Sequence, residues 1–387
     1  IMQAPVYPWR EGNRFTLRVD GESFFPHMLS CFEQAQKSID IELYLVESGR
    51  STRQWIDALL AARERGVQVR CLLDGVGTDG FRASERKELE QGGVVLRFYN
   101  PPRLLSGSRL FHRDHRKLFV IDRRLVLVGG TGISDEFCQP DPQTGTARWH
   151  EQMLEVEGPV VEDWLTLFEY EWDRVEERAR PGLAAVRRGQ VPPLPEGKDG
   201  QGRVAYIGAR EQKEVVASLL AAVKRSERRV WLATPYFLPS RRIRWALSRA
   251  ARRGIDVRLL LCGMTIDHPP VRYAGQRYYT RLLKAGVKIY EYQPRFTHLK
   301  TALVDDWVSL GSCNFDHWTL HWNLEANQQA VDSELAAAVA DSFENDFEQS
   351  HLWTLAEWKE LPRSHRFKIR FWGQINRWVM WIFGIPR

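Results

Sequence analysis

The sequence predicts an α/β protein with two pseudo-symmetric halves, each a mixed, mostly parallel sheet flanked by helices, and one active site shared between them. Three observations predict this fold. Helical and strand patterns alternate between residues 15 and 98, as in βαβ units. The same alternation returns between residues 225 and 292. A short pattern of His, Lys and Asp occurs once in each half, which indicates an internal duplication.

The elements of the first half can be placed from the spacing of their apolar residues. Helices are predicted over residues 24–36, 52–64 and 85–91. Strands are predicted over residues 38–46 and 67–74. The third helix should end at Gly92-Gly93, because glycine readily adopts the left-handed conformation that follows a helix.

The second half repeats short stretches of the first. Arg65–Gly75 (RGVQVRCLLDG) aligns with Arg253–Gly263 (RGIDVRLLLCG). A segment between the halves, residues 181–202, is rich in Pro and Gly and has no apolar periodicity, so it predicts a linker. The chain is therefore expected to consist of a first half (1–180), this linker, a second half (203–358) and a basic aromatic tail (359–387).

The repeated pattern is His-x-Lys-x4-Asp, and it comprises His115, Lys117 and Asp122 in the first half and His298, Lys300 and Asp305 in the second. His and Lys are two residues apart, so on a strand both side chains point to one face. The apolar residues between Lys and Asp predict a buried strand. Internal symmetry can therefore bring two imidazoles and two ammonium groups into one pocket.

Such a pocket suits a phosphodiester. The two lysines can neutralise its non-bridging oxygens, while Ser312 and Asn314 of the Gly-Ser-Cys-Asn segment add hydrogen bonds as charge builds up in the transition state. One histidine can attack phosphorus while the other protonates the departing alkoxide. Histidine suits both roles because its ordinary pKa of about 6.5 makes both protonation states accessible near neutral pH.

These motifs resemble the signature of the phospholipase D superfamily, His-x-Lys-x4-Asp followed by Gly-Ser/Gly-x-Asn, over nearly the whole chain. Within it, the chain is most similar to bacterial cardiolipin synthases of the shorter type without N-terminal transmembrane helices. Further matching segments are Trp9–Asn13, Glu157–Val160, Tyr236–Pro239, Gly311–Asn314 and Leu324–Asn327. The resemblance implies that a phosphatidyl group passes, through a phosphatidyl-histidine, from phosphatidylglycerol or phosphatidylethanolamine to phosphatidylglycerol or a related alcohol. It implies no metal or other cofactor.

The resemblance also implies roles for individual residues. His115 would be the nucleophile and His298 the acid, with the reverse assignment open. Glu325 would hydrogen-bond His298, and Glu151 would be the partner of His115. Asp122 and Asp305 are included in the catalytic set, although anchoring a loop is an equally acceptable role for an acid that ends a strand.

The phosphate-binding segment of the first half departs from the family pattern. It reads Gly129-Gly130-Thr131-Gly132, so Gly132 stands where the family has Asn. Gly130 and Thr131 would then have to bind the phosphate on this side. Losing one donor can cost about 100-fold in rate, and Gly132→Asn is expected to restore it if the glycine is a defect.

Composition leaves the partner open. The net charge of +6 predicts an anionic partner, but 55 basic residues stand against 49 acidic ones, so nucleic acid, anionic lipid and plain solubility all fit. Five scattered cysteines without a C-x-x-C pair argue for a reducing compartment and against a zinc or disulfide framework. His317, His321 and Glu325 have the spacing of a helical metal site, but Glu325 already has a role, so no metal is expected.

The tail favours lipid. As a helix it places Phe367, Phe371, Ile375, Trp378, Val379 and Ile382 on one face and Arg366, Arg370, Gln374 and Arg377 on the other. A basic, Trp-rich amphipathic helix is typical of a membrane interface; the alternative is a helix packed on the protein body. An apolar, basic loop over residues 101–112 is a second candidate contact.

We therefore expect a peripheral membrane protein at the cytoplasmic face of the bacterial inner membrane, since no apolar run approaches the ~20 residues of a spanning helix. Its partners would be an anionic phospholipid membrane, a phospholipid donor and an alcohol acceptor, without nucleic acid; the oligomeric state stays open. The alternatives are a phospholipase D-type phosphodiesterase or nuclease acting on nucleic acid, and a catalytically weakened membrane-binding homologue.

Overall fold

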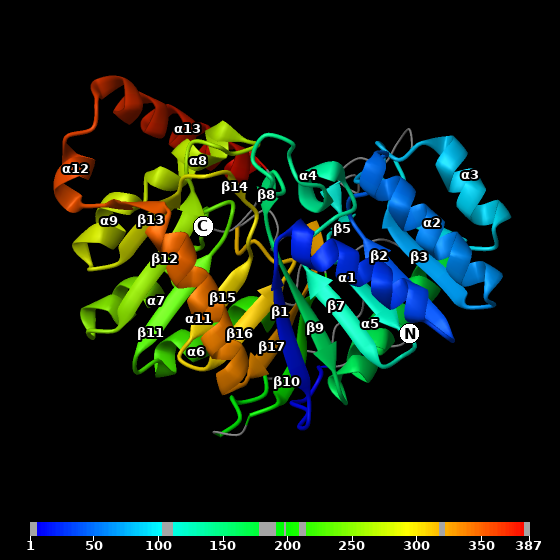
Figure 1. The fold of residues 1–387 in the computed structure, drawn as a ribbon. Coiled ribbons are helices and arrows are strands. Elements are labelled where there is room, and N and C mark those ends of the chain that lie inside the picture. Colours follow the sequence, from blue (N-terminus) through cyan, green and yellow to red (C-terminus); the bar gives the residue numbers. More distant parts are fainter. Residues whose placement is uncertain are drawn as a thin grey trace.

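The computed structural model describes residues 6–102, 111–177, 191–196, 199–208, 214–316 and 322–382. Two sheets lie side by side with helices packed on them (Figure 1). The expected elements of the first half are present as α1 (Gly21–Gln34), β2 (Ser38–Leu43), α2 (Arg50–Glu64), β3 (Gln68–Asp74) and α3 (Ala83–Gln91). The predicted linker ends inside a strand, since β10 begins at Gln201.

The first sheet has the strand order β1-β9-β7-β6-β2-β3-β4. Its remaining strands are β1 (Arg14–Val19), β9 (Gln152–Glu157), β7 (Leu125–Gly129), β6 (Leu118–Ile121) and β4 (Val95–Tyr99). The pairs β2·β3 and β3·β4 are parallel, and the other four pairs are antiparallel.

The second sheet has the order β10-β17-β16-β15-β11-β12-β13-β18, which repeats that of the first with one strand added. Its strands are β10 (Gln201–Ile207), β17 (Asn323–Val331), β16 (Trp307–Gly311), β15 (Thr301–Val304), β11 (Arg229–Ala233), β12 (Asp256–Cys262), β13 (Lys288–Tyr292) and β18 (Ser350–Trp353). The parallel pairs are β11·β12 and β12·β13. The duplication is therefore confirmed, but the expectation of mostly parallel sheets is wrong. The βαβ units supply only the parallel centre, and hairpins such as β6–β7 extend it in antiparallel fashion.

Helices divide the core into three parts. One core lies between the inner faces of the two sheets and includes α5 (Val160–Glu176) and α11 (Ser333–Glu348). The second packs under α6 (Glu214–Arg225) and α7 (Arg241–Arg252), and the third under α1 and α2. The shared central core fixes one half against the other.

Short strands also cross between the halves. β5 (Arg113–Asp114) pairs in parallel with β17 of the second half. β14 (Phe296–Thr297) pairs in parallel with β8 (Trp149–His150) of the first. The segments that carry the two His motifs are therefore exchanged between the halves.

The tail forms α13 (Arg363–Ile382), which follows α12 (Leu355–Lys359) and packs on α8 (Pro269–Gln276). The tail was expected either to lie in a membrane interface or to pack on the protein body, and the structure has features of both. The helix contacts the protein body, while Phe367, Phe371, Trp378 and Ile382 of the predicted apolar face remain exposed. Among the described helices, none is long and apolar enough to cross a bilayer.

Candidate active site

Main-chain pairing across the halves places each histidine. The N–H of His115, just after β5, donates to the carbonyl of Leu324 at 3.0 Å. The N–H of His298, just after β14, donates to the carbonyl of His150 at 2.8 Å. Asp74 at the end of β3 steadies the first of these segments, because its carboxylate accepts from Arg113 Nη1 at 3.1 Å and from Asp114 N–H at 2.9 Å.

The crossed strands give each imidazole a carboxylate from the opposite half. His115 Nδ1 lies 2.9 Å from Glu325 Oε1. His298 Nδ1 lies 2.6 Å from Glu151 Oε2. The expected pairing, Glu325 with His298 and Glu151 with His115, is therefore wrong. Since β17 carries Glu325 beside the first His segment and β8 leads into Glu151 beside the second, each acid reaches the histidine of the other copy.

This geometry presents Nε2 of each ring to the site. A carboxylate on Nδ1 holds the proton there, fixes the tautomer and stabilises the imidazolium that forms when Nε2 takes a proton. The Glu325 and Glu151 side chains are almost completely buried, so water does not compete with the histidines for their carboxylates. The two rings are thus equipped for nucleophilic and acid–base work.

The site lysines come directly before β6 and β15, close to their histidines in the short connections from β5 and β14. Lys117 Nζ donates to the His115 carbonyl at 2.6 Å, and Lys300 Nζ donates to the His298 carbonyl at 2.7 Å. Lys300 Nζ also lies 2.9 and 3.0 Å from the two ring nitrogens of His298. Tyr44 covers the first half-site, with its ring centroid 4.8 Å from that of His115.

Burial and crowding of positive charge shift the titration of these groups. Burial lowers the pKa of Lys117 to about 7 and that of Lys300 to about 8. The pKa of His298 falls well below its ordinary value through burial and the charges of Lys300, Lys117 and His115, which shows that the two half-sites share one electrostatic environment. Burial also raises the pKa of Glu151 to about 7. A bound phosphodiester would offset the excess positive charge.

The phosphate-binding segments differ from expectation. The hydroxyl of Thr131 is fully buried and donates to the Gly132 carbonyl at 2.9 Å, so it is not directed at a phosphate. The Ser312 hydroxyl accepts from Ala326 N–H at 3.1 Å and donates to Ala326 O at 3.4 Å, which fastens its loop to β17. Asn314 Oδ1 is buried without a hydrogen-bond partner among the described residues and can only accept a hydrogen bond, so a donor to phosphate from this amide would have to be Nδ2.

The glycines of the first copy are required by their neighbours. A Cβ on Gly132 would lie 2.8 Å from both the Cβ and the carbonyl oxygen of Leu45. A Cβ on Gly130 would lie 2.4 Å from Glu151 Oε2. Leu45 occupies the space that the Asn side chain of a Gly132→Asn variant would need, which favours a site rebuilt around glycine over a simple loss of a donor.

The aspartates of the two motifs lie away from the histidines. Asp122 accepts backbone N–H groups of Gln36, Lys37 and Ser38 at 2.7–3.1 Å. Asp305 accepts those of Glu227, Arg228 and Arg229 at 2.9–3.1 Å. Asp122 is five positions after Lys117, with the strand β6 between them, or about 16 Å at the usual strand rise. Their inclusion in the catalytic set is wrong: both are loop anchors.

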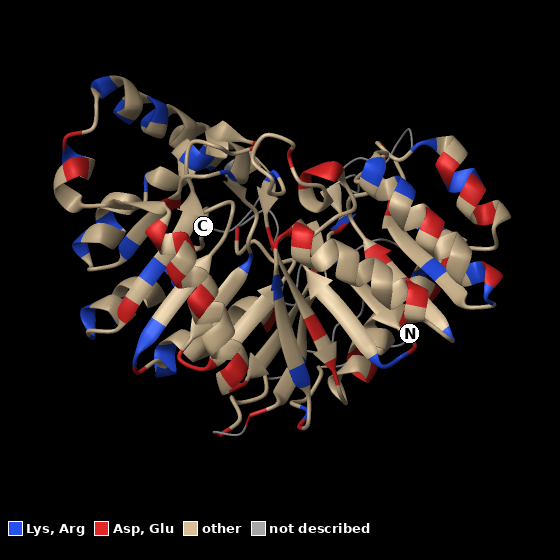
Figure 2. Cartoon of the chain, in the orientation of Figure 1, with Lys and Arg blue, Asp and Glu red and all other residues tan. Residues whose placement is uncertain are grey.

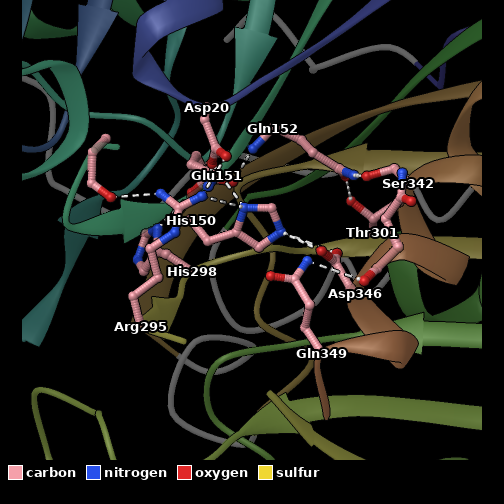
Figure 3. Close-up of polar contacts among 12 residues, drawn as sticks. Asp20, His150, Glu151, Gln152, Arg295, His298, Thr301, Ser342, Asp346 and Gln349 are labelled. Carbon is pink, nitrogen blue, oxygen red and sulfur yellow. Dashed lines mark hydrogen bonds and ion pairs between the residues drawn. The ribbon is translucent and has the colours of Figure 1, made fainter. Parts of the chain in front are cut away.

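A buried cluster of polar side chains near His298 was not predicted from the sequence (Figure 3). His150 lies between the two halves, with Nδ1 2.7 Å from Asp20 Oδ1 and Nε2 3.0 Å from Asp346. Arg295 also pairs with Asp20. Burial alone would lower the pKa of His150, but the carboxylates of Asp346 and Asp20 raise it to about 9. This imidazole is therefore a cation at neutral pH. Its one sequence signal is its position directly before Glu151.

Aromatic rings enclose His298. The centroids of Phe137, Trp149 and Phe296 lie 5.2, 5.5 and 5.8 Å from that of the imidazole. Among the described residues, no cluster of three or more His, Cys, Asp or Glu side chains could hold a metal ion. His317 and His321, like residues 103–110 of the apolar loop, lie outside the described residues.

Comparison with known proteins agrees with this geometry. The family model described as "Cardiolipin synthase, PLD-like domain" matches residues 28–172 and 219–347, one segment in each half. The chain belongs to the phospholipase D-like cardiolipin synthase family. This family membership makes the protein an enzyme of phospholipid metabolism.

Individual relatives match over much of their length. Cardiolipin synthase B of Shigella flexneri is 34% identical over 321 residues, which cover 81% of this chain and 75% of the relative. A cardiolipin synthase of Alkalihalophilus pseudofirmus is 31% identical over 355 residues, covering 90% and 68%. The crystal structure of a phosphatidylserine synthase from Haemophilus influenzae shares the fold, with a TM-score of 0.68 at 14% identity over 94% of this chain and 93% of that one.

Proposed function

We propose that the protein makes cardiolipin by transferring a phosphatidyl group from phosphatidylglycerol or phosphatidylethanolamine to the free hydroxyl of phosphatidylglycerol or a related alcohol. The observation that supports this most is the pair of crossed His–Glu contacts in one buried site with two lysines. Water-excluding rings around His298 favour an alcohol acceptor over hydrolysis.

In the first step, the phosphodiester lies between Lys117 and Lys300, which neutralise its non-bridging oxygens, with the Asn314 amide as a further donor. Nε2 of His115 attacks phosphorus. The bond from phosphorus to the head-group oxygen breaks, and His298, which becomes protonated once the bound phosphodiester offsets the positive charge around it, gives its proton to that oxygen. The first alcohol leaves, and the phosphatidyl group remains on His115.

In the second step, the acceptor alcohol occupies the vacated position. Neutral His298 takes its proton, and the alkoxide oxygen attacks phosphorus. The N–P bond breaks, the electron pair returns to His115, and cardiolipin is released. Glu325 and Glu151 hold the two rings through both steps, and each resting state is restored.

The experiment is to incubate the protein with phosphatidylglycerol in detergent micelles, and separately with phosphatidylethanolamine added, and to analyse the lipids by mass spectrometry. Cardiolipin should form, and protein denatured at mildly alkaline pH, where the N–P bond of a phosphatidyl-histidine survives, should carry phosphatidyl mass on the peptide containing His115. His115→Ala and His298→Ala should each abolish turnover while the protein still folds, as circular dichroism would show.

Single-stranded DNA is the comparison substrate. Cleavage of DNA without lipid exchange would replace the proposal with a nuclease. Vesicle binding without turnover of either substrate would indicate a weakened homologue. We also propose that the protein works as a peripheral protein on the cytoplasmic face of the membrane that contains its lipids.

A further inference from the structure

A large groove lies away from the histidines, on the second half of the molecule. It encloses about 1190 Å³ between α7, α9 (Tyr279–Lys284) and α13. Figure 1 shows α13 along the same end of the molecule as β8 and β14, which lead into the active site. The groove is therefore a surface separate from the site, toward the end of the molecule where β8 and β14 lie.

The walls of the groove are strongly basic. Eight arginines and one lysine line it, and no Asp or Glu does. α7 contributes Arg241, Arg244 and Arg252, and α13 contributes Arg366, Arg370 and Arg377. In Figure 2, α13 carries basic residues without an acidic one. None of the nine cations forms an ion pair with a carboxylate in the described part of the chain, although many other surface arginines do.

This charge is held in place by the packing of the tail. Arg277 Nη1 donates to the Gly373 carbonyl at 2.7 Å. His365 Nε2 lies 2.8 Å from Gln276 Oε1, and Trp358 Nε1 donates to Thr280 Oγ1 at 3.1 Å. Burial, Arg277 and Arg281 lower the pKa of Arg244 more than the neighbouring Tyr278 raises it, so like charges are crowded here. Like-charge crowding costs free energy, which an anionic ligand would relieve.

The rim of the groove is aromatic. Trp245 on α7 is 60% exposed, and Phe367 on α13 is 67% exposed. Phe371, Trp378 and Ile382 continue the stripe along the outer side of α13. Exposed apolar rings beside unpaired arginines match the boundary between lipid head groups and acyl chains, where apolar side chains enter the bilayer and cations meet phosphates. Nucleic acid would neutralise the arginines but would leave the apolar stripe in water.

We infer that this groove is a second lipid site, which binds the phosphate head groups of anionic phospholipids in a bilayer and directs the active site toward the membrane. The inference rests on the proposed function for the expectation that the substrate is a membrane lipid. It extends the predicted tail contact to arginines of α7, more than a hundred residues earlier in the chain.

The test is co-sedimentation of the full chain with vesicles of phosphatidylcholine alone or with a third of phosphatidylglycerol. The groove variant is Arg241→Glu with Arg252→Glu. The matched control is Arg225→Glu with Arg242→Glu, which makes the same charge change at exposed positions of α6 and α7 outside the groove. Each cation near a membrane surface contributes roughly a fivefold factor in binding, so the groove variant should bind phosphatidylglycerol vesicles at least tenfold more weakly, and the control within about twofold of wild type.

A second variant tests the rim without changing charge. Phe367→Ser with Phe371→Ser replaces two exposed rings, so folding should be unaffected, and vesicle binding should again fall about tenfold. Equal losses in the groove variant and the control, or undiminished binding in both the groove and rim variants, would overturn the inference. So would a loss of single-stranded DNA binding with vesicle binding intact. Turnover of detergent-solubilised phosphatidylglycerol should persist in all variants; its absence from the wild type would refute the proposed function instead.

Discussion

The crossed pairing of acids and histidines makes a sharp prediction for Glu325→Gln. This change keeps the shape of the side chain but removes the charge that lies 2.9 Å from His115 Nδ1. A hydrogen bond to a charged group contributes about 1.5–3 kcal/mol, which corresponds to a loss of about 10- to 100-fold in rate. Glu151→Gln should cause a loss of similar size through His298, its partner at 2.6 Å.

A substrate with a good leaving group separates the two effects. A phosphatidyl ester of p-nitrophenol releases its phenolate without an acid, so the first burst of colour depends on the nucleophile and not on the proton donor. Glu325→Gln should slow this burst, as His115→Ala abolishes it. Glu151→Gln should leave the burst nearly intact and slow only the later transfer, as His298→Ala does.

The controls are built into the set, because each Glu variant is compared with both His variants. The reasoning would be refuted if Glu325→Gln behaved like His298→Ala, since that result would restore the pairing within each copy. A reversal of all four phenotypes would keep the crossed pairs and exchange nucleophile and acid.

Five further predictions follow from four features of the structure. His150→Gln should lower the free energy of unfolding by about 3–5 kcal/mol by leaving Asp20 and Asp346 buried beside a neutral group, as urea titration would show. Because the pKa of His150 is raised to about 9 from its ordinary 6.5, its contribution of about 3 kcal/mol is complete below pH 6.5 and is lost as the pH rises through 9; unchanged stability between pH 6.5 and 9.5 would contradict this. Gly132→Asn should lower stability by about 1–3 kcal/mol through its clash with Leu45 and should not raise the rate. Asp122→Ala should lower the free energy of unfolding by about 1–2 kcal/mol, and with it the melting temperature, because three backbone N–H groups lose their acceptor. The protein that remains folded should keep its turnover number. Since the lysines bind the phosphodiester as cations, kcat/KM should fall as the pH rises through the pKa values of about 7 for Lys117 and about 8 for Lys300.

Much of the fold could be predicted because local patterns determine it. The helices α1, α2 and α3 and the strands β2 and β3 begin and end within about three residues of the ranges expected from apolar spacing. The duplication was visible because Arg65–Gly75 and Arg253–Gly263 retain the same order of polar and apolar residues. Strand direction could not be predicted in this way, since an apolar run has the same pattern in a hairpin and in a βαβ unit.

The site residues were found from their motif, but their contacts were not. Which carboxylate reaches which histidine depends on the exchange of β5 and β14 between the halves, and no spacing within one copy records it. Gly132 appeared defective because Leu45, which fills the space, is 87 positions away. His150 acquires its charge from Asp20 and Asp346, which are distant in sequence on either side of it.

The exchanged strands also affect how activity arises during synthesis. A ribosome that has released only the first half has made His115 without the acid that orients it, and Glu151 without the ring it serves. Neither duplicate can become chemically competent before the other has folded against it. Reactivity is thereby postponed until the second half has been made, and two separately expressed fragments should be inert until they are mixed.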